Sequence, residues 1–220
     1  MVVGCEVVFP GGQVSRIKNV PRRAAGPDIR HIVIGNEGAL CYLTEITVKL
    51  YPLPEAVSAA ICQFPSVDAA VRATIQIIQM GVPIARCELL DANAIRAVNR
   101  HSKLSLRELP MLLMEFHGSE AGVKEQAEMA QQIARENGGE DFQWATTPEE
   151  RTKLWTARHR AYFAGLQMKP GCRTVTTDTC VPISRLTECI SQAVEDAEGA
   201  GLQYYIVGHV GDGNFHIAYL

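Results

Sequence analysis

The 220-residue sequence lacks the long apolar runs and targeting signals that mark several classes of protein. No run approaches the roughly 18–20 residues of a membrane-spanning helix, and the N-terminus has no apolar signal-peptide core. Internal repeats and low-complexity tracts are absent as well. We therefore expect a globular protein without a transmembrane segment.

The charge and cysteine patterns exclude further classes. The formal net charge is −3 and the basic residues are scattered, so the sequence has no electrostatic footprint for nucleic acid. The seven cysteines are an odd number and form no C-x-x-C pair, which argues against a zinc ribbon or a disulfide framework. We expect free thiols in a reducing compartment.

Hydrophobic residues make up 47% of the chain, which is enough to bury a sizeable core. The first part reads as strands joined by turns, with a polar loop at Lys18–Asp28 and no helix long enough to cover a sheet. Pro52-Leu53-Pro54 then marks a boundary, because proline is stiff and has no N–H to donate to a sheet. We predict domains at residues 1–54 and 55–220. The strands expected in the first domain are Glu6–Phe9, Gln13–Ile17, His31–Ile34 and Tyr42–Leu50.

Strands and helices alternate in the second domain. This order predicts an open sheet with helices packed on one face, either ferredoxin-like or an elaboration of that fold. The expected strands are Val57–Phe64, Pro83–Leu90, Met111–Phe116, Phe142–Ala145, Thr174–Val181 and Leu202–Val207. The expected helices are one capped by Ser66 and four at Asp91–Arg100, Ser119–Asn137, Pro148–Leu166 and Ser184–Ala200.

The segment Gly208–His216, reading GHVGDGNFH, puts two imidazoles at the ends of a Gly/Asp/Asn turn. Apolar runs on both sides predict a hairpin with Asp212-Gly213 at its tip, so that His209 and His216 face each other. Opposed residues in such a pair have Cβ atoms roughly 4.5–5.5 Å apart, close enough for both rings to bind one divalent metal ion, zinc or manganese. A third ligand would have to come from elsewhere. The alternative is a tight turn with His209 in the core and His216 facing solvent.

Several motifs, taken in order, resemble those of one enzyme family. Residues Val33–Glu45 look like that family's G-S-E-G-T-L-G-I-I-T-E element, and Thr47–Glu55 looks like the exit strand that follows it. The hairpin motif and three further stretches resemble its C-terminal substrate domain. The family is the FAD-linked D-2-hydroxy acid dehydrogenases of the vanillyl-alcohol-oxidase-like flavoproteins, and the chain looks most like the mitochondrial-type, cytochrome-linked D-lactate dehydrogenases. The three stretches are Glu115–Ser119, Leu154–Arg158 and Thr177–Pro182.

The resemblance implies an α+β fold in two truncated pieces. Residues 1–54 would be the end of a vanillyl-alcohol-oxidase-type FAD-binding domain, and residues 55–220 a ferredoxin-like α/β substrate domain. The implied FAD contacts come from Gly35, Glu37 and Gly38, where glycine lets the backbone approach the cofactor closely. A plain turn between strands is the alternative.

Two positions depart from the family pattern. Cys41 stands where the family has glycine, which would add bulk near the flavin, and Pro27 stands where it has an aromatic residue. The family's third metal ligand, a glutamate, and its general base, a histidine, would lie beyond Leu220. We therefore predict that this chain alone is an inactive fragment.

Arg158 is the candidate for binding the substrate carboxylate, because a guanidinium matches two carboxylate oxygens and the family has an arginine in the same Trp-x-x-Arg context. The alternative is a solvated basic helix face. Asn214 is a turn former that would contact the substrate or orient a histidine ring.

The implied reaction is oxidation of D-lactate or a related D-2-hydroxy acid to the 2-oxo acid, with hydride passing to FAD and electrons on to a cytochrome-type acceptor. D-2-hydroxyglutarate or glycolate oxidation is the close alternative, and Arg173 is the candidate second cation for a dicarboxylate. A non-catalytic ferredoxin-like module that binds a metal or small ligand and a partner-binding scaffold are alternatives of other classes. The expected location is mitochondrial in a eukaryote, and otherwise cytoplasmic or peripheral to the inner membrane.

Overall fold

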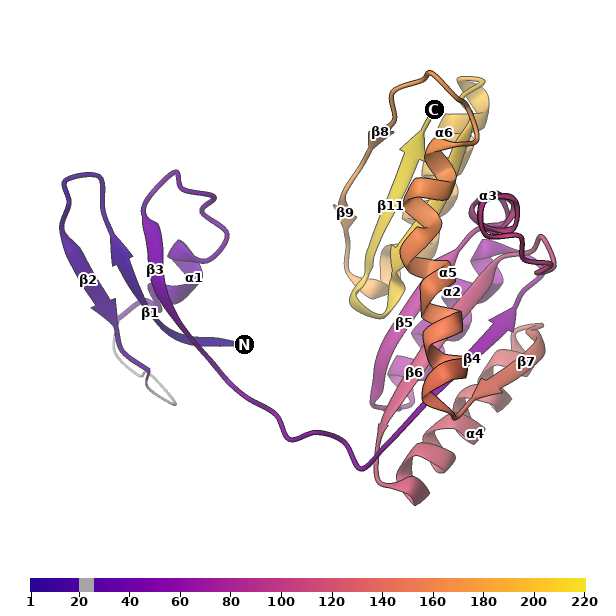
Figure 1. The fold of residues 1–220 in the computed structure, drawn as a ribbon, viewed down its shortest axis with the longest axis horizontal. Helices are drawn as coiled ribbons and strands as arrows, with labels where there is room; N and C mark the ends of the chain where they lie inside the picture. The colour runs from indigo at the N-terminus through magenta and orange to yellow at the C-terminus, as the bar shows by residue number, and fades with distance from the viewer. Residues whose placement is uncertain (20–25) are drawn as a thin grey trace. The chain divides into compact units, whose positions relative to one another are not determined.

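The computed structural model describes residues 1–19 and 26–220, so part of the loop predicted at Lys18–Asp28 lies outside the described residues. The chain forms two compact units, Met1–Leu53 and Pro54–Leu220 (Figure 1). Each unit has its own sheet and its own buried cluster of hydrophobic side chains.

The smaller unit is an antiparallel sheet with one short helix. Its strands are β1 (Val2–Val8), β2 (Val14–Ile17) and β3 (Tyr42–Val48), in the order β2-β1-β3. The Cys41 side chain is buried in the core of this unit beside Cys5. Cys41 is 2% exposed in this core.

The strand predicted at His31–Ile34 is wrong, because this segment is the helix α1 (Arg30–Val33). The Asp28 carboxylate accepts the backbone N–H of Arg30 at 3.1 Å and also its Nε–H at 2.9 Å. The last residue of this helix, Val33, is buried in the small core. Local hydrogen bonds and burial thus override the strand preference of the isoleucines and valine.

The larger unit is built on an eight-stranded sheet whose pairings are all antiparallel in the described residues. Its strands are β4 (Ala56–Gln63), β5 (Ile84–Leu90), β6 (Met111–Gly118), β7 (Glu140–Ala145), β8 (Val175–Thr176), β9 (Thr179–Cys180), β10 (Tyr204–His209) and β11 (Asn214–Tyr219). The first four lie in the order β7-β4-β6-β5, which is the ferredoxin-like arrangement. β10, β11 and β8 extend the sheet beyond β5, and β9 also pairs with β11.

The helices of this unit begin close to the predicted starts. They are α2 (Val67–Gln79), α3 (Ala92–Ser102), α4 (Glu120–Glu136), α5 (Pro148–Leu166) and α6 (Leu186–Gly199). The side chains of Ser66, Asp91, Ser119 and Thr147 each accept a backbone N–H from the first turn of the helix that follows. In the described part of the chain, no helix is both long enough and apolar enough to span a membrane.

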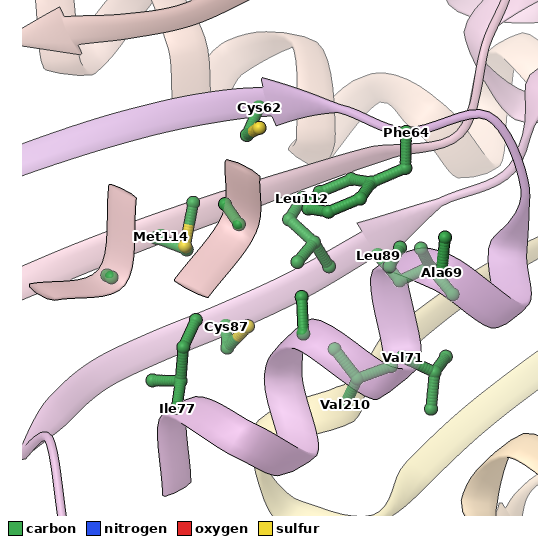
Figure 2. Close-up of a cluster of buried hydrophobic side chains, with 14 of the residues drawn as sticks. Cys62, Phe64, Ala69, Val71, Ile77, Cys87, Leu89, Leu112, Met114 and Val210 are labelled. Atoms are coloured by element: carbon green, nitrogen blue, oxygen red, sulfur yellow. The ribbon is translucent and has the colours of Figure 1, made fainter. Parts of the chain in front are cut away.

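Helices cover both faces of the sheet, so the prediction that they pack on one face is wrong. α2, α4 and α6 pack on one face, and Figure 2 shows Leu112 and Met114 of β6 in the same buried cluster as Val71 and Ile77 of α2. α3 and α5 pack on the opposite face, where Met111 and Leu113 of the same strand are buried. The uninterrupted apolar run Met111–Met114 is the signal of a strand buried on both faces.

The single strand predicted at Thr174–Val181 is also wrong, because the segment is divided into the short strands β8 and β9. The Thr177 hydroxyl accepts the backbone N–H of Ile217 at 3.2 Å, in place of a backbone carbonyl. A side chain thus takes over one bond of the ladder and interrupts the strand there.

Candidate active site

β10 and β11 form the predicted hairpin in a register that differs from the prediction. His209 pairs with Asn214, and His216 pairs with Val207. The expectation that the two histidines lie directly opposite each other is therefore wrong. The strands are joined by a short 3-10 turn at Val210–Asp212, which uses fewer residues than two opposed histidines would need.

The two imidazoles form a diagonal pair on one face of the hairpin. His216 pairs with Val207, two residues before His209, and residues two apart on a strand point to the same face. The ring centroids are 5.6 Å apart, and the ring planes are inclined by 87°. The rings are therefore neighbours despite the changed register.

Each imidazole is held through its Nδ1 atom. His209 Nδ1 lies 2.8 Å from Glu88 Oε1, and His216 Nδ1 lies 3.1 Å from the carbonyl oxygen of Thr177. Since a carbonyl or a carboxylate can only accept, both Nδ1 atoms carry the hydrogen. Neither Nε2 atom has a hydrogen-bond partner in the described parts of the chain, so both are available to a ligand.

Glu88 on β5 joins the hairpin to α5, and no sequence motif pointed to it. Its Oε2 accepts from Arg158 Nε at 3.1 Å and lies 3.0 Å from Arg158 Nη2. The side chains of Glu88 and Arg158 are 13% and 15% exposed, so this is a largely buried ion pair. Arg158 is thus turned toward the histidines and is not part of a solvated basic face.

Arg158, His209 and His216 line one hollow of about 360 Å³ on the α5 side of the sheet. The other lining residues are Tyr162, Thr176, Tyr205, Val207 and Ala218. The Tyr205 hydroxyl is buried without a hydrogen-bond partner in residues 1–19 and 26–220. Burial raises the pKa of Tyr205 to about 12, so the hydroxyl is a neutral donor. The volume and the few polar groups suit a small polar ligand.

A larger hollow of about 880 Å³ lies between α4 and the start of β4, and its wall includes Trp144 and Arg151. It contains none of the predicted site residues. The smaller hollow is the candidate site, because the residues predicted to bind a metal ion and the substrate carboxylate meet there.

Asn214 is not among the residues that line the hollow. Its Nδ2 donates to Asp178 Oδ1 at 2.8 Å and to the Thr179 carbonyl at 3.1 Å. Asp178 Oδ1 in turn lies 3.5 Å from His216 Nδ1. The geometry links Asn214 to the orientation of the His216 ring.

Gly35, Glu37 and Gly38 lie in a turn of the smaller unit. Their φ angles are 80°, 49° and 81°, all in the left-handed region. Asn36 holds the turn, because its Oδ1 accepts the backbone N–H of Leu40 at 3.1 Å. The residues expected to contact FAD thus belong to one unit, and those expected to bind substrate and metal belong to the other.

A complete metal site is not formed by the described residues. No group of three or more His, Cys, Asp or Glu side chains in residues 1–19 and 26–220 is placed to hold one ion. His117, near the end of β6, has its Nε2 atom 2.8 Å from Glu115 Oε1.

Comparisons with known proteins agree on one family. The sequence model described as "FAD linked oxidases, C-terminal domain" matches residues 53–220. "Probable D-lactate dehydrogenase, mitochondrial" of Danio rerio is 45% identical over 219 residues, which cover 98% of this chain and 44% of that protein. "D-lactate dehydrogenase [cytochrome], mitochondrial" of Arabidopsis thaliana is 40% identical over 216 residues, covering 98% and 38%. The chain therefore spans less than half the length of these relatives.

Solved structures share the fold at low sequence identity. An alkyldihydroxyacetonephosphate synthase aligns with a TM-score of 0.72 and 18% identity, over 100% of this chain and 46% of that one. At this level of identity the match speaks for the fold alone. The predicted α+β fold with a ferredoxin-like sheet is confirmed.

Proposed function

Because the chain belongs to the FAD-linked oxidases, we propose that it is part of an FAD-dependent dehydrogenase that oxidises D-lactate or a related D-2-hydroxy acid to the 2-oxo acid. The observation that carries this proposal is the gathering of Arg158, His209 and His216 around one hollow. A 2-hydroxy acid presents a carboxylate and a neighbouring hydroxyl, which suit a guanidinium and a metal ion respectively. The names of the two mitochondrial relatives support the same activity.

Arg158 binds the substrate carboxylate in this proposal. Its Nε and Nη2 atoms are directed at Glu88, which leaves Nη1 for a ligand. Arg158 is the one permanent cation among the lining residues of the hollow, whereas Arg173 is exposed and is not among them. Among the described residues, the hollow therefore offers one permanent cation, which matches the single carboxylate of a monocarboxylic acid such as D-lactate.

His209 and His216 supply two ligands of a divalent ion, zinc or manganese. The hydrogen bonds of both rings fit this role, because metal-bound histidines usually donate their other N–H to a carboxylate or a backbone carbonyl. Here the partner of His209 is the Glu88 carboxylate, and the partner of His216 is the Thr177 backbone carbonyl. When bound, the ion would polarise the oxygens of the substrate and lower the pKa of its hydroxyl. Asn214 steadies the arrangement through Asp178.

Residues 1–54 are the end of an FAD-binding domain, and residues 55–220 are the substrate domain. The flavin, when bound, supplies the hydride acceptor. The positive φ angles of Gly35, Glu37 and Gly38 turn the backbone sharply, and this turn would present peptide groups to the cofactor. The names of the relatives support a cytochrome-type electron acceptor and a mitochondrial location in a eukaryote.

The test is a chimera in which this chain replaces the matching segment of the Danio rerio relative. The purified chimera should carry flavin absorbance and reduce cytochrome c with D-lactate, and less well with glycolate or D-2-hydroxyglutarate. Arg158→Met should lower kcat/KM for D-lactate by roughly 30-fold or more, the effect of removing one partner of a buried charge pair. Arg160→Met is the matched control, since Arg160 is exposed on the same helix.

Two results would contradict the proposal. One is a folded, flavin-loaded chimera that oxidises none of the three acids. The other is an equal effect of the two arginine substitutions.

A further inference from the structure

Glu88 occupies a position between the two functional groups of the site. β5 and β10 are antiparallel, and Leu90 pairs with Val207 and Leu89 with Gly208. Continuing this register by one residue places Glu88 opposite His209. Each of its carboxylate oxygens accepts a hydrogen bond from a different partner, Oε1 from His209 Nδ1 and Oε2 from Arg158 Nε. This one largely buried side chain therefore contacts both His209, the proposed metal ligand, and Arg158, the proposed partner of the substrate carboxylate.

We infer that Glu88 is the positioning residue of the site, fixing the tautomer of His209 and the orientation of Arg158 at the same time. The inference rests on the proposed function, because it assigns Glu88 a role in preparing that site. The carboxylate holds the hydrogen of His209 on Nδ1, which leaves Nε2 as the atom that can bind a metal ion. It also engages the Nε edge of Arg158, which leaves the Nη1 end for a substrate carboxylate.

Only a side chain with two acceptor oxygens can serve both partners. Arg158 and the Nδ1–H of His209 are donors, so each needs an acceptor. A glutamine at position 88 has the same shape but one acceptor and one donor end. If its oxygen faces Arg158, its amide NH₂ faces His209 and the ring must move its hydrogen to Nε2. If its oxygen faces His209, the NH₂ meets the guanidinium.

The experiment is ¹⁵N NMR of the histidine and arginine side chains in the 220-residue chain, with Zn²⁺ binding measured by calorimetry on the same samples. Wild-type His209 should show the Nδ1–H tautomer. Glu88→Gln should move His209 toward the Nε2–H tautomer or remove the hydrogen-bonded Arg158 Nε–H signal. Its Zn²⁺ affinity should fall by about 10- to 100-fold, as for other residues that orient metal-binding histidines.

Glu115→Gln is the matched control. Glu115 lies on the neighbouring strand, is 9% exposed, and bonds His117 at the same 2.8 Å distance. This substitution should leave the His209 and Arg158 signals and the Zn²⁺ affinity unchanged.

An Nε2–H tautomer of His209 in the wild type would overturn the inference without any variant having to fold. So would His209 and Arg158 signals that are unchanged in Glu88→Gln, or changed equally by the control. If the wild type binds no Zn²⁺ but the NMR signals separate the two variants as expected, the inference stands and the metal part of the proposed function fails.

Discussion

Asp91 combines an N-cap role with deep burial. It is 4% exposed and accepts the backbone N–H of Ala94 at 2.7 Å at the start of α3. Burial raises the pKa of its carboxyl from 3.8 to about 7. Because the folded state holds this proton more tightly than the unfolded chain, the contribution of Asp91 to stability is complete below about pH 4 and is lost as the pH rises through about 7.

Asp91→Asn should remove this pH dependence, because asparagine also caps helices but does not ionise. We expect the unfolding free energy of the wild type to fall relative to the variant between about pH 4 and pH 7, measured by urea denaturation at several pH values. Parallel pH profiles of the two proteins would show that Asp91 ionises normally.

The cysteines should differ widely in reactivity. Burial raises the pKa of Cys62 and of Cys87 to about 12, so neither forms the reactive thiolate near neutral pH. Cys172 and Cys180 are exposed. A disulfide-exchange reagent followed by mass spectrometry should label these two in the native protein, and the buried pair only after unfolding. Native labelling of Cys87 at the rate of Cys172 would contradict the packing described.

At the residue scale, sequence motifs pointed to residues that the structure brings together, and no motif pointed to Glu88, whose contacts depend on packing. Arg158, His209 and His216 come from recognisable stretches and line one hollow. Glu88 lies in a segment that reads as an ordinary strand, and its partner His209 is 121 residues further along. Its role arises only when β5 and β10 become neighbours, which no local pattern encodes.

Helix α5 approaches β10 closely because residue 165 has no side chain. A Cβ atom at Gly165 would lie 2.2 Å from two ring carbons of Tyr205. Gly165→Ala should therefore destabilise the protein by about 1–3 kcal/mol through overpacking, as measured by urea denaturation. It should also disturb the hollow that Tyr205 lines.

Gly199→Ala is the control for this helix contact. A Cβ at Gly199, in the last turn of α6, would meet nothing within 4 Å. Alanine there should be neutral or stabilising by up to about 1 kcal/mol, because it restricts the unfolded chain and favours helix. Equal changes in the free energy of unfolding at the two glycines would contradict a specific clash between the new methyl group and Tyr205.

At the element scale, capping residues made the helix starts predictable, whereas strand prediction failed where side chains take part in the backbone network. Asp28 closes the turn that replaces the predicted strand at His31–Ile34. Thr177 interrupts the strand predicted after Thr174. The predicted pairing of His209 with His216 was wrong because the length of the turn between β10 and β11 depends on its packing against α2 and β5 as well as on turn propensity.

The two units should differ in their independence. The larger unit has a hydrophobic cluster on each face of its sheet, whereas the described residues of the smaller unit form a core of four buried hydrophobic side chains. A chain that starts at Pro54 should unfold cooperatively in urea, because it keeps both hydrophobic clusters of the larger unit. Residues 1–53 alone should lack a cooperative transition, because so few side chains are buried.

Circular dichroism and tryptophan fluorescence would follow these transitions, since Trp144 and Trp155 both lie in the larger unit. Loss of cooperative unfolding on removal of residues 1–53, or cooperative unfolding of those residues by themselves, would contradict the expectation.

At the scale of the whole molecule, the family and the ferredoxin-like order of β4 to β7 were predicted correctly. The covering of both sheet faces was not, because alternating strands and helices do not say on which side each connection passes. The apolar run in β6 was the available signal, and it reads equally well as an ordinary core strand until α3 and α5 are seen to bury Met111 and Leu113.

The junction at Leu53 and Pro54 is a point at which the gene could recombine during evolution. Each buried cluster draws its members from one side of that junction alone. A genetic crossover at this point would divide none of these three buried clusters. Two coding segments of different ancestry could be joined there, and each unit would inherit its own buried cluster intact.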